Sequence, residues 1–253
     1  MHEPDLFKTP QGRELAYHRT PGDSPGVIFL GGFMSDMDGT KARYLEDWAR
    51  QTGREFLRFD YSGHGQSSAR FEEGSIGIWA EDAMQVVDHL SQGPQILVGS
   101  SMGGWIALLV AKSRPERIAG LVTIAAAPDF TEDSMLAGFD TAQRAALEAD
   151  GVVYLPSDYG DPYPVTRNLI EDGRRHLVLR DRLDLEFPVR FLQGTDDEDV
   201  DKSVAMTLLE HATGADMTLT MVKGADHRFS DDTCLELIRS SVEEVTARAE
   251  MQK

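Results

Sequence analysis

Residues 95–105 read Gln95-Ile96-Leu97-Val98-Gly99-Ser100-Ser101-Met102-Gly103-Gly104-Trp105. An apolar, strand-forming run leads into a Gly-x-Ser-x-Gly turn, and an apolar helical pattern follows it. In such a turn the glycines remove side chains that would collide where a strand bends sharply into a helix, and the strained serine exposes its oxygen. The spacing selects Ser101 as the nucleophile, because a motif centred on Ser100 would need glycine at Val98.

Short apolar runs alternate with helical patterns along most of the chain, which is typical of βαβ units with parallel strands. We expect strands at residues 15–18, 27–30, 55–59, 96–98, 121–124, 189–192 and 217–222, with 15–18 at the edge of the sheet. Helices are expected at residues 41–50, 78–90, 102–113, 202–211 and 231–248. The predicted fold class is α/β, with a mostly parallel, doubly wound sheet.

The alternation breaks between Pro128 and Glu186. This stretch carries a helical pattern near 137–149, a segment rich in proline and tyrosine, and a second helical run. Open α/β sheets bind ligands at the carboxyl ends of their strands, and this stretch follows a strand that ends there at Ile124. We therefore predict a single domain over residues 1–253, with a helical lid insertion at about 129–186 above Ser101.

A serine hydroxyl becomes an effective nucleophile when a histidine takes its proton and a carboxylate orients that histidine. On a strand-turn-helix nucleophile the expected chain order is serine, acid, histidine. After Ser101, only His227 directly follows a predicted strand, whereas His176 lies in the insertion and His211 in a helix. We therefore predict that His227 is the base.

The acid is sought at the end of another strand, where residues 194–200 read Gly-Thr-Asp-Asp-Glu-Asp-Val. The Gly-x-x-Asp-x-x-Val spacing selects Asp197, and Asp196 and Asp199 are expected to be solvated turn residues or a helix cap. A metal site in this acidic loop is the alternative. No second cluster of carboxylates or histidines in the sequence supports it, so we predict neither a metal nor a cofactor.

Acyl transfer also needs hydrogen-bond donors for the oxyanion. The backbone N–H groups of Met102, directly after the nucleophile, and of Phe33, in the turn after strand 27–30, are the predicted donors. Trp105 and Tyr159 are predicted to contact the substrate, although Trp105 also suits ordinary core packing. His64, between two glycines, precedes the nucleophile and is expected to be a packing or surface residue.

The formal net charge of −18 argues against nucleic acid or an anionic lipid surface as a partner. No apolar stretch approaches the length of a membrane span. The single cysteine, Cys234, excludes an internal disulfide and is expected to be a buried helix residue. The first residues lack the basic and apolar pattern of a secretion signal and the arginine-rich pattern of a transit peptide, so a cytoplasmic location is expected.

Several motifs together resemble the α/β-hydrolase superfamily. They are residues 32–42 (Gly-Phe-Met-Ser-Asp-Met-Asp-Gly-Thr-Lys-Ala), 58–63 (Arg-Phe-Asp-Tyr-Ser-Gly), the stretch 93–105 and Asp226-His227-Arg228. Within the superfamily, the chain resembles the branch with a mitochondrial palmitoyl-protein thioesterase that is also an acyl-glucuronide esterase. The resemblance runs from about residue 15 to the last helix. It implies the triad and oxyanion donors already named.

Two departures from that branch stand out. Relatives often carry proline after the valine of the acid loop, where this chain has Val200-Asp201. Residues 131–152 of the insertion match only loosely, and lids set substrate choice in this superfamily. The resemblance therefore supports the type of bond cleaved more firmly than the substrate.

The leading functional prediction is a serine hydrolase of the carboxylesterase or acyl-protein thioesterase type. It would cleave an ester or thioester of a small-molecule or acylated substrate through an acyl-enzyme on Ser101. Carbon-carbon bond hydrolysis and haloperoxidase-type chemistry on the same triad are alternatives, and a weakly catalytic ligand receptor is an alternative from another class. Dehalogenase and epoxide hydrolase chemistry is disfavoured, because it needs an aspartate in place of Ser101.

Overall fold

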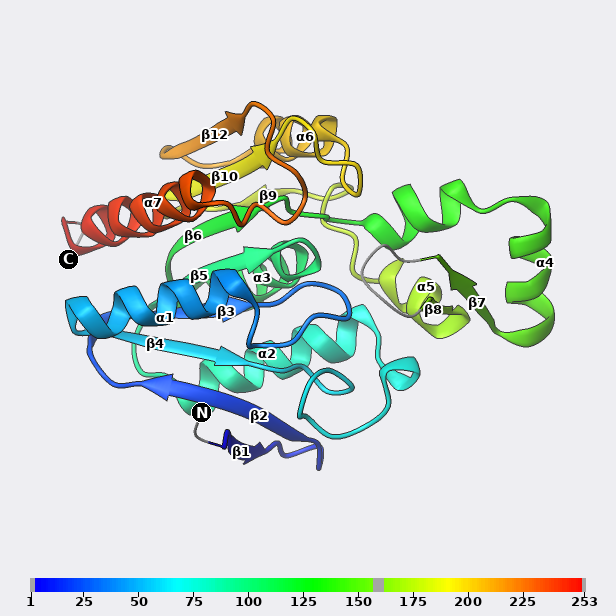
Figure 1. Cartoon of the computed structure of the whole chain (residues 1–253), viewed down its shortest axis with the longest axis horizontal. Coiled ribbons are helices and arrows are strands. Elements are labelled where there is room, and N and C mark those ends of the chain that lie inside the picture. Colours follow the sequence, from blue (N-terminus) through cyan, green and yellow to red (C-terminus); the bar gives the residue numbers. More distant parts are fainter. Residues whose placement is uncertain (1–2, 157–161, 252–253) are drawn as a thin grey trace.

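A large, mostly parallel sheet forms the centre of the molecule (Figure 1). The computed structural model describes residues 3–156 and 162–251. In sheet order, the strands are β1 (Asp5–Lys8), β2 (Glu14–Thr20), β4 (Arg54–Phe59), β3 (Asp23–Leu30), β5 (Gln95–Ser100), β6 (Ile118–Ile124), β10 (Val189–Gly194) and β12 (Met217–Val222). The strands from β4 to β12 pair in parallel, whereas β1 and β2 are antiparallel to their neighbours. The carboxyl ends of the parallel strands therefore share one edge.

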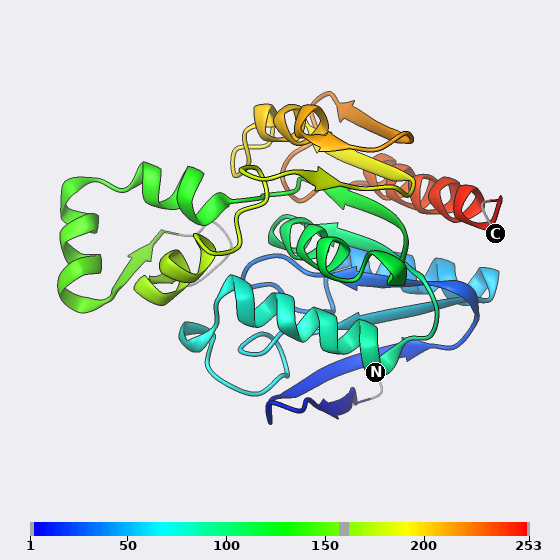
Figure 2. The ribbon, with the colours of Figure 1, turned by 180° about the vertical axis from the view of Figure 1, so that it is seen from behind.

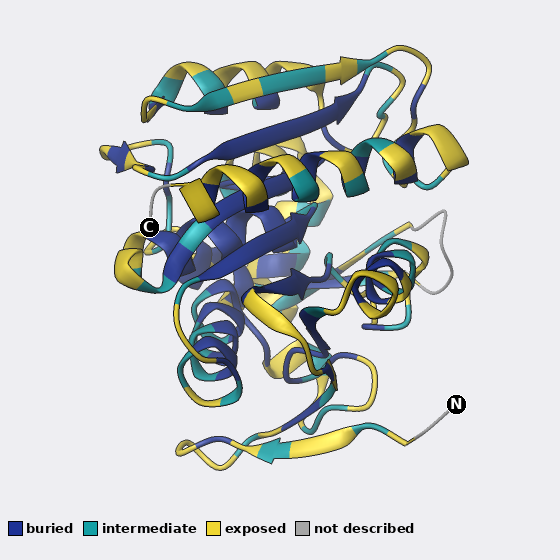
Figure 3. Cartoon of the chain, turned by 90° about the vertical axis from the view of Figure 1, so that its left-hand side faces the viewer, coloured by how far each residue is buried: buried dark blue, intermediate teal, exposed yellow. Residues whose placement is uncertain are grey.

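Helices cover both faces of the sheet, as the views from front and back show (Figures 1 and 2). On one face lie α1 (Thr40–Thr52) and α7 (Asp232–Met251), and on the other α2 (Ile76–Leu90), α3 (Met102–Ser113) and α6 (Lys202–His211). Strands covered on both sides need continuous apolar runs, and β5 is buried at every position. The edge strand β12 is partly exposed beside the fully buried β10 (Figure 3). Cys234 is buried in α7.

A segment between β6 and β10 leaves the sheet and extends past the carboxyl ends of the strands (Figures 1 and 2). Its elements are the π-helical turn at Thr131–Leu136, α4 (Thr141–Asp150), β7 (Val152–Leu155), β8 (Tyr163–Thr166), α5 (Arg167–Gly173) and β9 (Leu183–Asp184). Its buried apolar side chains, such as Leu147 and Val165, belong to the same core cluster as those of α2 and α3. The segment is therefore packed onto the rest of the fold.

The Asp129 side chain links the two connections through which the chain enters and leaves this segment. Its buried carboxylate accepts hydrogen bonds from the N–H groups of Val178 at 2.8 Å and Leu179 at 3.0 Å. Burial raises the pKa of Asp129. The base of the segment is thus tied across its two connections.

The predicted mostly parallel, doubly wound sheet is confirmed, and each predicted strand and helix is present with ends shifted by a few residues. The placement of residues 15–18 at the edge is wrong, because β1 pairs outside β2. Only Phe7 of β1 packs against the core, so this four-residue strand has no alternating pattern to detect. The remaining short elements are the 3-10 turns at Phe71–Glu73 and Pro115–Arg117 and the strand β11 (Ala212–Thr213). Within residues 3–156 and 162–251, no helix combines the length and apolar character needed to cross a membrane.

Candidate active site

Ser101 occupies the turn between β5 and α3 in a strained backbone conformation, with φ 54° and ψ −121°. A Cβ atom on Gly99 would lie 2.3 Å from the carbonyl oxygen of Gly103, and one on Gly103 would lie 2.1 Å from that of Leu30. Both positions therefore require glycine. The Ser101 N–H donates to the Ile124 carbonyl at 2.9 Å, which anchors the turn to β6.

Three loops at the carboxyl edge of the sheet bring Ser101, Asp197 and His227 together. His227 Nε2 lies 3.1 Å from Ser101 Oγ, and His227 Nδ1 lies 3.0 Å from each carboxylate oxygen of Asp197. Asp197 follows β10 and His227 follows β12, neighbouring strands in the sheet. The arrangement joins a hydroxyl, an imidazole and a carboxylate in series.

The Asp197 side chain is fully buried, and both of its carboxylate oxygens accept hydrogen bonds. Besides His227, it accepts hydrogen bonds from the Gln193 side-chain amide at 2.8 Å and from the N–H groups of Val200 at 2.8 Å and Asp199 at 3.0 Å. Burial opposes ionisation, but the hydrogen bonds from His227, Val200 and Gln193 outweigh it and hold the pKa of Asp197 below its usual value. The carboxylate therefore stays charged beside the imidazole.

Other residues of the acid loop differ in what they do. Asp201, which stands where relatives often have proline, caps α6 by accepting the Ser203 N–H at 2.8 Å. Asp196 accepts the Thr195 hydroxyl at 3.0 Å and is exposed, as predicted for a turn residue. Asp199 is also exposed, but it lines the cavity beside Ser101.

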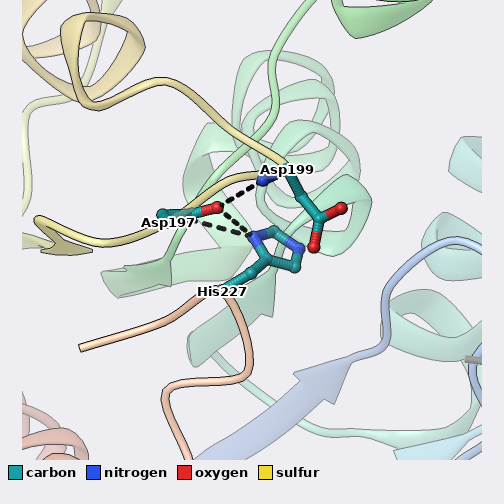
Figure 4. Close-up of side chains that lie close together, drawn as sticks. All are labelled: Asp197, Asp199 and His227. Carbon is teal, nitrogen blue, oxygen red and sulfur yellow. Dashed lines mark hydrogen bonds and ion pairs between the residues drawn. The ribbon is translucent and has the colours of Figure 1, made fainter. Parts of the chain in front are cut away.

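Asp197, Asp199 and His227 have metal-like spacing, with one ligand atom from each within 4.8 Å of the others (Figure 4). Within the described parts of the chain, no other group of three or more histidine, cysteine or acidic side chains has such spacing. Both oxygens of Asp197 already accept hydrogen bonds, and the His227 ring is held between Asp197 and Ser101. The geometry therefore suits orientation of the imidazole better than coordination of a cation.

A cavity of about 540 Å³ opens beside Ser101 and His227. Its apolar lining comes largely from the β3–α1 loop, the stretch after β6 and the inserted segment, and includes Phe33, Phe130, Met135, Leu155, Pro156 and Tyr163. Lys41 and Arg228 line another part of the wall, where the Lys41 ammonium donates to the Arg228 carbonyl. Burial lowers the pKa of Lys41 to about 8, against the opposing effect of Asp226. Apart from Phe33, these residues were not predicted as site residues, because they come from loops distant in the chain.

The two predicted substrate contacts fare differently. Trp105 does not line the cavity: it is fully buried, its ring packs edge-on against Phe130, and its Nε1–H donates to the His176 carbonyl at 3.0 Å. The packing alternative therefore describes Trp105, because the first turn of α3 points its side chain into the core. Tyr159 lies outside the described residues.

The predicted oxyanion donors, Phe33 and Met102, both line the cavity. Met102 is the first residue of α3, so its N–H has no carbonyl partner within that helix. The turn that carries Phe33 lies against the nucleophile, since a Cβ atom on Gly32 would be 3.5 Å from the Ser101 Cβ. The backbones that carry both predicted donors therefore lie close to the serine.

His64 is a packing residue rather than a surface one, with 4% of its surface exposed. Its ring lies edge-on to those of Tyr61, Phe71 and Trp79. Burial lowers the pKa of His64 from 6.5 to about 4, although its contact with the Ser62 carbonyl acts in the opposite direction. The imidazole is therefore neutral at pH 7.

Acid should destabilise the fold through His64. Between pH 6.5 and 4 the unfolded chain binds a proton on this imidazole and the folded chain does not, so stability falls as the pH falls through that window. The expected loss attributable to His64 by pH 4.5 is about 2–3 kcal/mol. Urea unfolding at pH 7 and pH 4.5 measures it, and His64→Gln should lose less stability over the same interval. Equal losses in the two proteins would contradict the assignment.

The comparisons with known proteins agree with this architecture. A family model described as alpha/beta hydrolase fold matches residues 25–163. The chain belongs to the α/β-hydrolase family. The fold class predicted from the sequence, including the hydrolase family itself, is thereby confirmed.

Two curated relatives align with nearly all of this α/β hydrolase. The bovine palmitoyl-protein thioesterase ABHD10, mitochondrial, is 33% identical over 95% of this chain and 79% of its own length. The human protein of the same name is 33% identical over 97% of this chain and 78% of its own length. The predicted resemblance to this branch is confirmed.

Two solved structures are similar along almost their whole length. A putative hydrolase from Agrobacterium vitis S4 has a TM-score of 0.91 and 38% identity, with 97% of this chain and 98% of that one covered. The mouse alpha/beta hydrolase domain-containing protein 10 has a TM-score of 0.88 and 31% identity, covering 96% and 98%.

The expected cytoplasmic location is wrong. The bovine, human and rat relatives of this α/β hydrolase are all mitochondrial by name. The expectation rested on the composition of the first few residues, whereas similarity along the whole chain points to relatives in another compartment.

Proposed function

We propose that this α/β hydrolase cleaves an ester or thioester through an acyl-enzyme on Ser101. The observation that carries the proposal is the 3.1 Å contact between Ser101 Oγ and His227 Nε2, with Asp197 on the other ring nitrogen. A neutral imidazole in this position accepts the hydroxyl proton as the oxygen attacks. The relatives named as palmitoyl-protein thioesterases support acyl transfer as the reaction class.

In the first half-reaction, Ser101 Oγ attacks the acyl carbon and its proton passes to His227 Nε2. The carbonyl oxygen becomes an oxyanion, which accepts hydrogen bonds from the N–H groups of Phe33 and Met102. The charged imidazolium is stabilised by the Asp197 carboxylate. The tetrahedral intermediate then collapses, and His227 gives its proton to the departing thiol or alcohol.

In the second half-reaction, water attacks the acyl-enzyme while His227 Nε2 accepts its proton. A second tetrahedral intermediate forms at the same two donors and collapses as the proton returns to Ser101 Oγ. The products are a carboxylic acid and the free enzyme. The cycle needs no group beyond the triad, the backbone donors and water.

The acyl group fits the apolar part of the cavity, where Phe130, Met135 and Leu155 lie on or next to the inserted segment. We propose that residues 129–186 act as a lid that sets acyl-chain preference within a single domain. Apolar walls favour an alkyl or aryl acyl group, because burial of such a group removes apolar surface from water. The substrate is thus a small molecule or carrier with an apolar acyl group.

A fluorophosphonate probe should attach to a single residue, Ser101. Its phosphorus takes the place of the acyl carbon, so an activated serine oxygen attacks it, displaces fluoride and stays covalently bound. Intact-mass analysis and peptide mapping identify the adduct. The labelled protein is then compared with unlabelled protein on acyl thioesters and matching oxygen esters of increasing chain length, and on a ring-cleavage dienoate. An adduct elsewhere, or turnover of the dienoate alone, would overturn the proposal.

A further inference from the structure

One motif of the sequence has no part in the triad: the Gly63-His64-Gly65 turn after β4. Its histidine is buried, whereas the turn it belongs to faces the loop that carries Phe33. His64 Nε2 accepts the backbone N–H of Met34 at 3.3 Å. Since that nitrogen accepts, the proton sits on Nδ1, which faces the Ser62 carbonyl at 3.3 Å.

The loop that His64 contacts contains a residue in an unfavourable backbone conformation. Met34 has φ 54°, in the left-handed region that a residue with a side chain rarely occupies. Such a conformation persists where surrounding contacts over-determine it. Here Ser35 bonds back to the Gly32 carbonyl from its N–H at 3.2 Å and its hydroxyl at 2.9 Å. The hydrogen bond from the Met34 N–H to His64 connects this turn to the neighbouring loop.

We propose that His64 is a positioning residue that aims the Phe33 N–H at the oxyanion by holding the next peptide group, that of Met34. The Phe33 ring packs edge-on against two other rings, with ring centroids 4.9 Å from Phe71 and 5.8 Å from Phe130. This packing restrains one side of the residue. The hydrogen bond to His64 restrains the peptide on the other side. With both sides held, the Phe33 backbone is fixed in the turn that lies beside Ser101.

The surroundings of His64 are built to hold its ring in place. The Ser62 carbonyl that faces Nδ1 also accepts the Trp79 Nε1–H at 3.0 Å, and the Ser62 N–H and hydroxyl donate to buried Asp82. Asp82 is in turn paired with Arg13 at 2.7 Å. His64 is thereby anchored to α2 and to the turn between β1 and β2, away from the substrate cavity.

A second contact joins the same two loops. One carboxylate oxygen of Asp60 accepts the Met37 N–H at 2.7 Å and the other accepts the Gln66 N–H at 2.8 Å. A Cβ atom on Gly65 would lie 2.1 Å from Asp60, so the glycine allows this approach. Asp60 thus fixes the far end of the Phe33 loop, and His64 fixes the end next to the nucleophile.

The inference rests on the proposed function, because it assigns His64 to the oxyanion donor of that reaction. The test compares His64→Phe, which keeps an aromatic ring in the cluster but removes the acceptor, with His64→Gln, whose side-chain oxygen can accept the Met34 N–H. Active sites are counted by fluorophosphonate labelling before kinetics on an acyl thioester. For His64→Phe we expect kcat per labelled site to fall by about tenfold to a hundredfold with KM little changed, and for His64→Gln to recover most of it.

An oxyanion readout separates positioning from general stability. An alkyl trifluoromethyl ketone, which forms a tetrahedral oxyanion on the serine, should lose affinity for His64→Phe by the same factor as kcat/KM. Tyr61→Leu is the control. The Tyr61 ring packs edge-on to the His64 ring, with centroids 5.5 Å apart, but it takes no part in the hydrogen bond between Met34 and His64. It should lower thermal stability while leaving kcat per labelled site near the wild-type value.

Unchanged kcat per site in folded His64→Phe, or an equal loss in Tyr61→Leu, would overturn the inference. If His64→Phe does not fold, the wild-type protein still tests it: hydrogen exchange should show the Met34 amide protected at pH 7, and free exchange there would refute it. A wild-type protein that neither labels at Ser101 nor turns over any acyl ester fails the proposed function instead. The two failures are therefore distinguishable.

Discussion

Replacement of Ser101 by alanine should lower kcat for an acyl thioester by about 10⁴-fold to 10⁶-fold. Without Oγ no acyl-enzyme forms, and His227 has no hydroxyl from which to take a proton. The backbone donors and the cavity remain, so binding of the substrate should change little. Turnover by the purified protein measures the loss. The thiol released from the thioester is followed with a chromogenic thiol reagent.

Ser100→Ala is the matched control, because it removes a hydroxyl from the adjacent residue of the same motif. Ser100 is the last residue of β5 and has 7% of its surface exposed. This variant should keep most of the wild-type activity and its fluorophosphonate label. If Ser101→Ala instead retained full activity, the nucleophile would lie elsewhere and the proposed mechanism would be wrong.

Asp197→Asn should lower kcat by about 10³-fold to 10⁴-fold with little change in the fold. The aspartate accepts from both the His227 Nδ1–H and the Gln193 amide, whereas an asparagine facing the ring presents an N–H₂ group. That group favours the tautomer in which Nδ1 is the acceptor and Nε2 carries the proton. An Nε2–H imidazole has no lone pair with which to accept the proton of Ser101.

Asp199→Asn removes the same charge two residues further along the loop and serves as the control. Asp199 lies near the triad but does not hold the Nδ1 side of His227, which Asp197 contacts at 3.0 Å through both oxygens (Figure 4). Its loss should be less than about tenfold, as expected for a change in charge without a change in tautomer. Comparable losses from the two variants would show that charge, and not orientation of the ring, is what the loop supplies.

The order of the elements and the identity of the candidate triad were predictable because their signals are local. A Gly-x-Ser-x-Gly turn needs glycine where backbone atoms approach within van der Waals distance, and the close approaches at Gly99 and Gly103 show why. Asp197 and His227 each follow a strand, and parallel strands place their carboxyl ends at one edge. Chain order and strand position selected His227, and the Gly-x-x-Asp-x-x-Val spacing then singled out Asp197 among the acids of its loop.

Other features depended on contacts between distant segments. Trp105 is a large aromatic residue that suits a substrate contact, but its direction on α3 places its side chain in the core. The strand β1 was missed because its two apolar residues, Leu6 and Phe7, are adjacent and show no alternation. His64 was expected to be a packing or surface residue and is buried, yet its hydrogen bond from Met34 joins two loops and has no signature in the sequence.

By itself, the sequence determined the succession of strands and helices, the strained serine and the two residues aligned with it, since periodicity, glycine positions and spacing all act over a few residues. Only the tertiary structure decided the shape and lining of the cavity, the burial of His64 and the alignment of the Phe33 loop with Ser101. Those depend on how loops from separate βα units meet at the sheet edge. Side-chain direction and burial there arise from packing among residues far apart in the chain, which no local pattern encodes.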